Sequence, residues 1–224
     1  EPKLTEEGKQ CGRWPTHPRL AVMVGRARRH PRRLPLACWL VAWLEEQPGV
    51  SDIDLSSVLC ARDKFRHPRW HQAASQWAQR LNSSLDIHMQ TLNNDLAYLL
   101  LDAYPDRLGI ALGGGQFKLI SGGQANVPDT CPLAHADFII AVELDAQASQ
   151  ARIFSAASVG YTHLEQHFPS TQTWQDHAYW DDRLGRLVAE QTRRLVLGDH
   201  ELVLERKAQS KGTSGLPPEQ VRHA

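Results

Sequence analysis

The spacing of apolar residues in the first half of the chain predicts a helical domain. Apolar side chains recur every three or four residues after Pro18 and Pro68, which is the period of a helix with one buried face. The stretch 34–47 is apolar nearly all round, which indicates a central helix buried on every side. A further helix is expected to follow Asn93-Asn94, which can cap it, and to end before Pro105, because the residue before a proline avoids the helical region.

The second half of the chain has a different pattern. After Arg107, short alternating or apolar runs are separated by glycine and aspartate pairs. Such runs predict strands of a small antiparallel barrel or sandwich, with one short helix at 164–168 between two of them. The predicted strands are 116–120, 138–144, 152–156, 173–180, 186–195 and 201–204. The sequence therefore predicts an α+β fold with the helical domain first.

Charge is unevenly distributed along the chain, although 25 basic residues balance 25 acidic ones. Every charged residue between Gly8 and Leu44 is basic, whereas acidic residues outnumber basic ones from Tyr104 to Ala208. This asymmetry permits nucleic-acid binding near the N-terminal end without requiring it.

Cysteine usage and hydropathy indicate a cytoplasmic protein without a membrane partner. The four cysteines form no CxxC pair, so a reduced setting is the simplest interpretation. No apolar run reaches the roughly 20 residues that a membrane span needs. Because the first residue is Glu1 and not Met, we expect the chain to be part of a longer protein.

A cluster of arginines is the first candidate for phosphate contact. It consists of Arg26, Arg28, Arg29, Arg32 and Arg33, at an expected helix end beside the central helix. Guanidinium groups match phosphate oxygens in geometry and charge. A solvated helix end is the alternative, because cations there also complement the helix dipole.

A second basic stretch contains Arg66 and Arg69 beside Trp70. Basic charge next to a stackable ring is typical of a path for a single strand. Trp70 also lies at helical spacing from Trp77, however, which favours a place in the core for both rings.

Two further candidates lie in the second half. Arg107 is predicted either to contact a nucleic-acid strand or, more consistently with a domain junction, to tie the domains through Asp106 or a helix end. Lys118 lies on a predicted strand and is a candidate for a contact on the barrel face.

The sequence contains no motif for catalysis. No GxxxxGK[ST] loop or acidic metal-binding motif is present, so ATP hydrolysis by this chain is not expected. The pairs His163–His167 and His67–His71 have the spacing of zinc ligands but lack an evident third ligand, so surface or partly buried histidines are favoured over a metal site.

Two stretches resemble a known helicase family. Residues 4–9 and 14–23 are similar to the passage of DEAH-box helicases in which a winged-helix domain meets a helical ratchet domain. The motif at 101–107, the glycine run and residues 129–133 resemble the start of the OB-like domain of HrpB-type helicases, and 180–186 resembles a later hairpin. Where that family carries further arginines after its Tyr-Pro-Asp-Arg motif, this chain has Ile110 and its apolar neighbours.

The resemblance implies a domain organisation and a function. The expected domains are the end of a winged helix at 1–15, a helical ratchet domain at 16–103, an OB-like antiparallel β-barrel at 104–206, and a linker with the start of another domain at 207–224. The chain would handle single-stranded RNA beside RecA-like motor domains, which bind ATP and magnesium, and would itself need no cofactor. The alternative is a protein-interaction scaffold without nucleic-acid contact.

Overall fold

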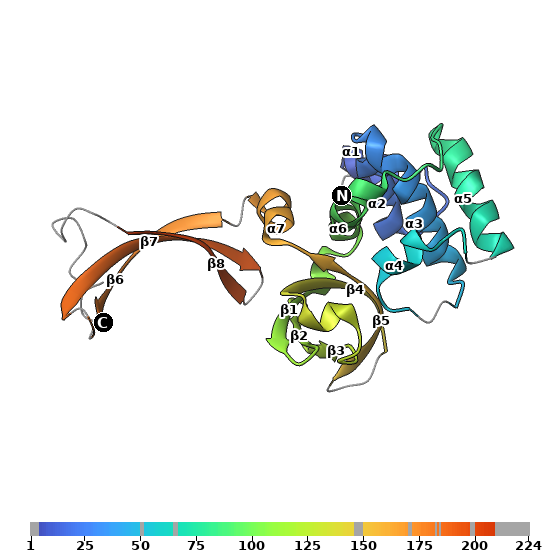
Figure 1. Cartoon of the computed structure of the whole chain (residues 1–224). Coiled ribbons are helices and arrows are strands. Elements are labelled where there is room, and N and C mark those ends of the chain that lie inside the picture. The colour runs from blue at the N-terminus through green and yellow to red at the C-terminus, as the bar shows by residue number, and fades with distance from the viewer. Residues whose placement is uncertain are drawn as a thin grey trace. The chain divides into compact units, whose positions relative to one another are not determined.

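The computed structural model describes residues 5–49, 52–64, 67–145, 150–169, 172–181, 183, 185–197 and 200–208. The chain divides into two compact units, Glu1–His163 and Leu164–Ala224. The first holds a helical bundle and a closed barrel, and the second holds a three-stranded sheet (Figure 1). The predicted α+β class is confirmed.

Prolines lie at the ends of several helices of the bundle. The helix α2 starts at Pro18 and α5 at Pro68, as predicted, and α6 ends at Ala103, two residues before Pro105. Proline suits a first helical turn because it lacks only an N–H that would have no partner there. The α-helices of the bundle among the described residues are α1 (Glu6–Cys11), α2 (Pro18–Ala27), α3 (Leu34–Glu46), α4 (Leu55–Cys60), α5 (Pro68–Leu81) and α6 (Leu92–Ala103).

The helix α3 is the centre of the bundle, as its all-round apolar sequence predicts. Every residue from Pro35 to Trp43 is buried. On the α5 side, Trp70 Nε1 donates a hydrogen bond to the Trp39 carbonyl at 3.0 Å, and the two indole rings meet edge to face at 5.3 Å. Trp70 is fully buried, so the prediction that it belongs to the core is confirmed.

The start of α6 differs from the prediction. The cap residue is Thr91, and Asn93 lies inside the helix. A 3₁₀ turn, Met89–Thr91, runs directly into α6, and Leu92, the first helical residue, is buried. Burial of Leu92 and continuity with the preceding turn therefore place the start before Asn93, although asparagine is a favourable capping residue.

The barrel follows α6 through a 3₁₀ turn at Pro105–Arg107. Its strands close in the order β1-β2-β3-β5-β4, and only the β3–β5 pair is parallel. Phe117, Ile139 and Ile153 are fully buried in its interior. The strands are β1 (Leu108–Gly113), β2 (Gln116–Leu119), β3 (Gln124–Asn126), β4 (Phe138–Leu144) and β5 (Ala151–Val159).

The predicted range 104–206 holds two sheets instead of one. The barrel closes with β5, because β3 pairs with β5 and β1 pairs with β4. Neither β1 nor β3 was predicted. Within the described residues, the last three predicted strands pair only with one another, as an antiparallel sheet in the order β6-β7-β8. They are β6 (Gln172–Asp181), β7 (Arg186–Leu197) and β8 (His200–Ala208), and α7 (Tyr161–His167) precedes them in the chain.

Candidate nucleic-acid interface

The predicted arginine cluster lies at one corner of the helical bundle, where α2 ends. Arg26 is in the last turn of α2, and Arg32 and Arg33 are in the 3₁₀ turn Pro31–Arg33. Arg28 and Arg29 lie between the two. We call these five residues the basic corner. Their cations lie at the negative end of the α2 dipole, which offsets part of the repulsion between neighbouring positive charges.

Two members of the basic corner form ion pairs with helix α6. Arg26 Nη1 lies 2.9 Å from Asp102 Oδ1, and Arg33 Nε lies 3.0 Å from Asp95 Oδ1. The Arg33 guanidinium also lies 4.2 Å from the centre of the Tyr98 ring. All three partners belong to α6, so these two arginines attach the end of α2 and the following turn to that helix.

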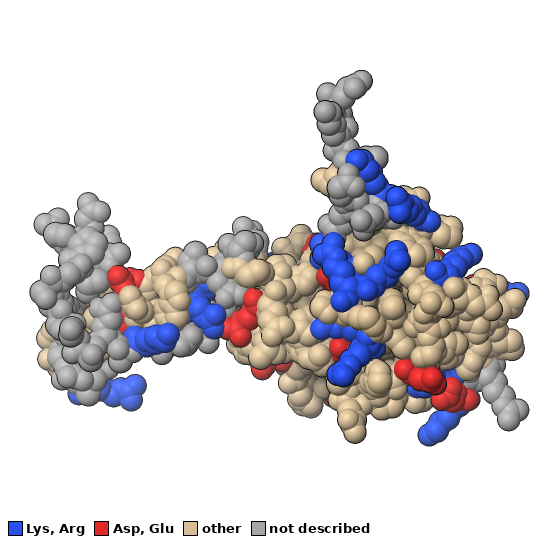
Figure 2. Space-filling view, turned by 90° about the horizontal axis from the view of Figure 1, so that it is seen from above, with Lys and Arg blue, Asp and Glu red and all other residues tan. Residues whose placement is uncertain are grey.

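The other three members, Arg28, Arg29 and Arg32, are exposed. Arg28 lies over the Trp14 ring, 5.8 Å from its centre. Arg29 and Arg32 line a surface cavity of about 370 Å³ together with Thr91. Figure 2 shows Lys and Arg side chains gathered on the face of the bundle seen from above. Exposed guanidinium groups of this kind can bind phosphate oxygens without first giving up a buried partner.

The remaining predicted residues lie on other elements. Arg69 is exposed in the first turn of α5. Lys118 is half-buried on β2, between the inward-facing Phe117 and Leu119, and so lies on the outer face of the barrel. Arg66 lies outside the described residues. The structure therefore groups the arginines of the basic corner, whereas it places Arg69 and Lys118 on separate elements.

Arg107 lies at the junction of the bundle and the barrel, where it bonds within the protein. Its Nη1 donates to the carbonyl of Val142 on β4, and its guanidinium lies 5.2 Å from the centre of the Tyr104 ring. Asp106, the partner considered for Arg107, instead receives two hydrogen bonds from Arg19 on α2, one of them 3.0 Å from Arg19 Nη2 to Oδ2. Both arginines therefore connect elements across the junction.

Ionisation at this junction follows from the same contacts. The hydrogen bond from Arg19 lowers the pKa of Asp106 and raises that of Arg19. Burial raises the pKa of the Tyr104 hydroxyl. At neutral pH the Arg19–Asp106 pair is therefore charged while Tyr104 is neutral, so its hydroxyl can both donate and accept a hydrogen bond.

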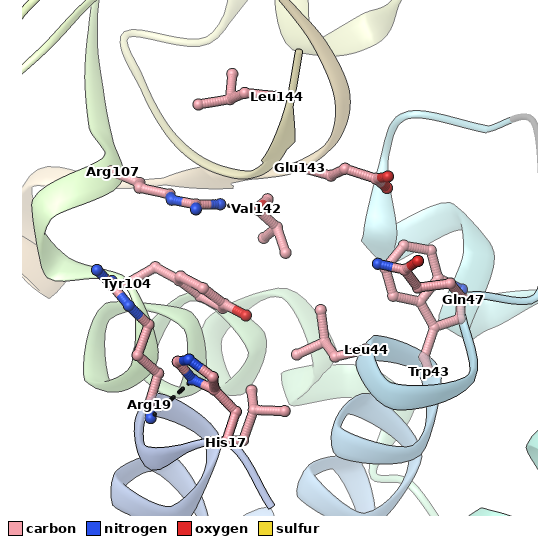
Figure 3. A pocket seen from close by; sticks show the side chains of 11 residues that line it. His17, Arg19, Trp43, Leu44, Gln47, Tyr104, Arg107, Val142, Glu143 and Leu144 are labelled. Atoms are coloured by element: carbon pink, nitrogen blue, oxygen red, sulfur yellow. Dashed lines mark hydrogen bonds between the residues drawn. The ribbon is translucent and has the colours of Figure 1, made fainter. Parts of the chain in front are cut away.

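A cavity of about 460 Å³ opens beside this junction (Figure 3). Tyr104 and His17 lie on one side of it, and Trp43 and Gln47 lie on the other. A second cavity of about 360 Å³ shares Trp43, Gln47 and Glu143 with the first. We call the two together the seam groove. Its lining residues are His17, Arg19, Leu20, Trp43, Leu44, Gln47, Gly49, Ile53, Tyr104, Arg107, Val142, Glu143, Leu144, Arg152, Ile153 and Phe154.

Trp43 is the unusual residue of the seam groove. It is only 5% exposed, and its Nε1 has no hydrogen-bond partner among the residues that the structure describes. A buried donor without an acceptor costs about 1–3 kcal/mol. At the far end of the groove, the Arg152 guanidinium lies 5.5 Å from the centre of the exposed Phe154 ring. The groove thus has aromatic rings and cations along one seam, beside a buried donor.

The sequence pattern does not reveal the seam groove. Trp43 lies in an all-round apolar helix, which predicts a place in the core, and Gln47 and Glu143 belong to no motif. Arg19 belongs to the Pro-Arg-Leu passage that resembles helicases, but its ion pair with Asp106 joins residues far apart in the chain. That motif was the one available signal for the groove.

His163 and the other histidines form no metal site in the described residues, where no group of three or more His, Cys, Asp or Glu could hold a metal ion. His163 Nδ1 accepts the Gly160 N–H at 3.0 Å, and its Nε2 lies 3.0 Å from Asn94 Oδ1. Burial lowers the pKa of His163. The neutral ring, with its hydrogen on Nε2, fits both contacts.

The arrangement of bundle and barrel has counterparts among solved structures. E. coli DExH-box NTPase HrpB matches with a TM-score of 0.67 at 27% identity, over 94% of this chain and 25% of that one. The resemblance to HrpB-type DEAH-box helicases is confirmed. A second structure of E. coli HrpB, described as a DEAH/RHA helicase, matches with a TM-score of 0.64 at 24% identity, over 95% of this chain and 25% of that one. No family model and no curated protein matches the chain.

The HrpB match covers nearly all of this chain but a quarter of the HrpB chains. It therefore relates the present fold to one part of a helicase. Among the described residues, no helix combines the length and apolar character needed to cross a bilayer.

Proposed function

We propose that this chain is the nucleic-acid-handling accessory region of an HrpB-like, ATP-dependent RNA helicase, and that it follows the RecA-like motor domains of that protein. The match to E. coli HrpB along 94% of the chain carries the proposal. In this proposal the motor binds ATP and magnesium, and the bundle and the barrel hold single-stranded RNA while the motor moves along it. All four cysteines are free, which fits a reducing, cytoplasmic setting.

The basic corner is the proposed phosphate contact. Arg28, Arg29 and Arg32 are exposed, while Arg26 and Arg33 position the turn through α6. A strand that must move past the surface needs contacts that form and break readily. Exposed guanidinium groups meet that need, because they contact the phosphate of each nucleotide in the same way, whatever its base. Three such contacts predict that the logarithm of affinity falls with the logarithm of salt concentration at a slope of about 2.

The test is fluorescence-anisotropy binding of the whole chain to a labelled single-stranded RNA at two salt concentrations. We expect salt-sensitive binding by the native chain, and its loss when Arg28, Arg29 and Arg32 are all changed to Glu. A matched control changes Arg80, Arg152 and Arg183 to Glu, which alters the total charge equally at exposed positions elsewhere in the chain.

The outcomes separate the two interpretations of the chain. Equal loss in both triple variants would mean that total charge, and not the basic corner, governs binding. Absence of binding by the native chain at low salt would contradict the proposed function and would favour a protein-interaction scaffold.

A further inference from the structure

The sheet β6–β8 carries two exposed tryptophans on one strand. Trp174 is 44% exposed and Trp180 is 55% exposed. Both lie on β6, an even number of residues apart, so they face the same side of the sheet. Both rings are therefore accessible to a binding partner. Six residues of strand place the two rings about 20 Å apart. Trp174 is therefore a contact point separate from Trp180.

The strand register places cations around the Trp174 ring. On β7, Arg193 lies directly opposite Trp174. On β8, Lys207 lies opposite Gln191, which is two residues before Arg193 and so on the same face of the sheet. The Lys207 Nζ is 4.4 Å from the centre of the ring, and the Arg193 guanidinium carbon is 6.0 Å from it. Both distances are within the range of cation–π attraction. The indole is therefore held in place by two positive groups while much of its surface remains accessible.

Two acidic groups, Glu165 and Asp176, make hydrogen bonds close to this ring. Glu165 on α7 accepts a hydrogen bond from Arg193 Nη2. Asp176, which shares the face, accepts one from Gln191 Nε2 at 2.7 Å. The Arg193–Glu165 pair helps to fix the guanidinium beside the indole. Lys207 makes the closer cationic contact with the ring, at an exposed position.

An accessible indole beside two cations matches the chemistry of a single-stranded nucleic acid. A base can stack on the exposed ring, and the flanking phosphates can reach the ammonium and guanidinium groups. Lysine is depleted in the interfaces of folded proteins, whereas Lys207 is the closer of the two cations over this ring. Charge complementarity therefore favours the nucleic acid.

We propose that this face of the β6–β8 sheet binds single-stranded RNA by stacking one base on Trp174, with Lys207 and Arg193 holding the adjacent phosphates. The site rests on the proposed function and adds to it a contact in the second unit, separate from the basic corner. Because every base presents a flat face, the contact tolerates any sequence.

The experiment measures binding of the whole chain to two labelled strands of equal length, oligouridylate and an abasic strand with the same backbone. The substitution Trp174→Ala is expected to weaken oligouridylate binding about tenfold and to leave abasic binding unchanged, because only stacking is lost. Trp174→Phe keeps an aromatic face and is expected to lose less. His177→Ala, on the opposite face of β6, is the matched control and is expected to bind as the native chain does.

Lys207→Gln keeps the ring and removes one cation, so it tests the site independently of any effect of Trp174→Ala on folding. It is expected to weaken binding of both strands and to reduce the salt dependence. Native affinity of both Trp174→Ala and Lys207→Gln for oligouridylate would overturn this inference alone. Absence of RNA binding by the native chain would overturn the proposed function and this inference together.

Discussion

Gly115 shows how a single residue determines the geometry of the barrel. Its φ is +69°, and a Cβ added there would lie 2.6 Å from the carbonyl oxygen of Val127. The Val127 N–H in turn donates to the Gly115 carbonyl at 2.9 Å. The two backbones are thus in close contact just before β2 begins, and a side chain at this position would separate them.

The substitution Gly115→Ala is expected to lower the free energy of unfolding by about 2–4 kcal/mol, because it adds a backbone clash to a left-handed conformation. Gly114→Ala is the control: its φ is also left-handed, at +57°, but open space surrounds its Cβ position. Its cost is expected to be about 1 kcal/mol. Urea unfolding of both variants measures the difference, and equal costs would contradict a clash with Val127.

The arginines of the basic corner show what sequence reveals about a site and what it does not. Their density and the absence of acidic neighbours predicted a basic surface. Sequence did not separate Arg26 and Arg33 from the other three, because their partners Asp102 and Asp95 lie on α6, more than 60 residues further along the chain. Ion pairs formed by folding thus decide which cations of such a cluster remain available.

At the scale of elements, helices were predictable and several strands were not. Helix α3 is recognisable because nearly every residue is apolar and a glycine follows soon after its end. Strand β1 contains two glycines, and β3 has only three residues, so neither has a clear alternating pattern. Each becomes a strand by pairing with a partner, as β1 does with β4 and β3 with β5. Those long-range pairs also determine where the barrel closes.

Two buried tryptophans of the bundle allow the unpaired donor in α3 to be tested. Trp70 Nε1 bonds to the Trp39 carbonyl, whereas Trp43 Nε1 has no partner among the described residues. Trp70→Phe is therefore expected to destabilise the chain by about 1 kcal/mol more than Trp43→Phe, since both lose similar volume but only Trp70 loses a hydrogen bond. Chemical denaturation measures both. An equal or larger cost for Trp43→Phe would indicate that its Nε1 has an acceptor in the folded protein.

At the scale of the whole first unit, bundle and barrel are joined by polar contacts whose partners no local pattern predicted. The Ala156 N–H on β5 donates to the Ile53 carbonyl before α4 at 2.9 Å. Arg107 reaches the Val142 carbonyl on β4. Arg19 on α2 holds Asp106 in the turn before β1. Arg19, Arg107, Val142 and Ile53 also line the seam groove, so these contacts form part of its wall.

The Arg19–Asp106 pair is expected to make this junction sensitive to acid. Because the pKa of Asp106 is lowered in the folded chain, its stabilising contribution is fully present above the unfolded pKa of about 4. It is lost as the pH falls through the lower, folded value. Both side chains are more than a third exposed, so solvent screening limits the contribution to about 1 kcal/mol or less.

The substitution Asp106→Asn measures that contribution. The native chain is expected to exceed the variant in free energy of unfolding by a constant amount from pH 7 to about pH 5. The gap is expected to narrow below about pH 4, as Asp106 takes up a proton and releases Arg19. Asp86→Asn, at an exposed position, controls for the loss of one carboxylate. A gap that widened in acid would show that the charge on Asp106 opposes the junction, since protonation would then favour the folded chain.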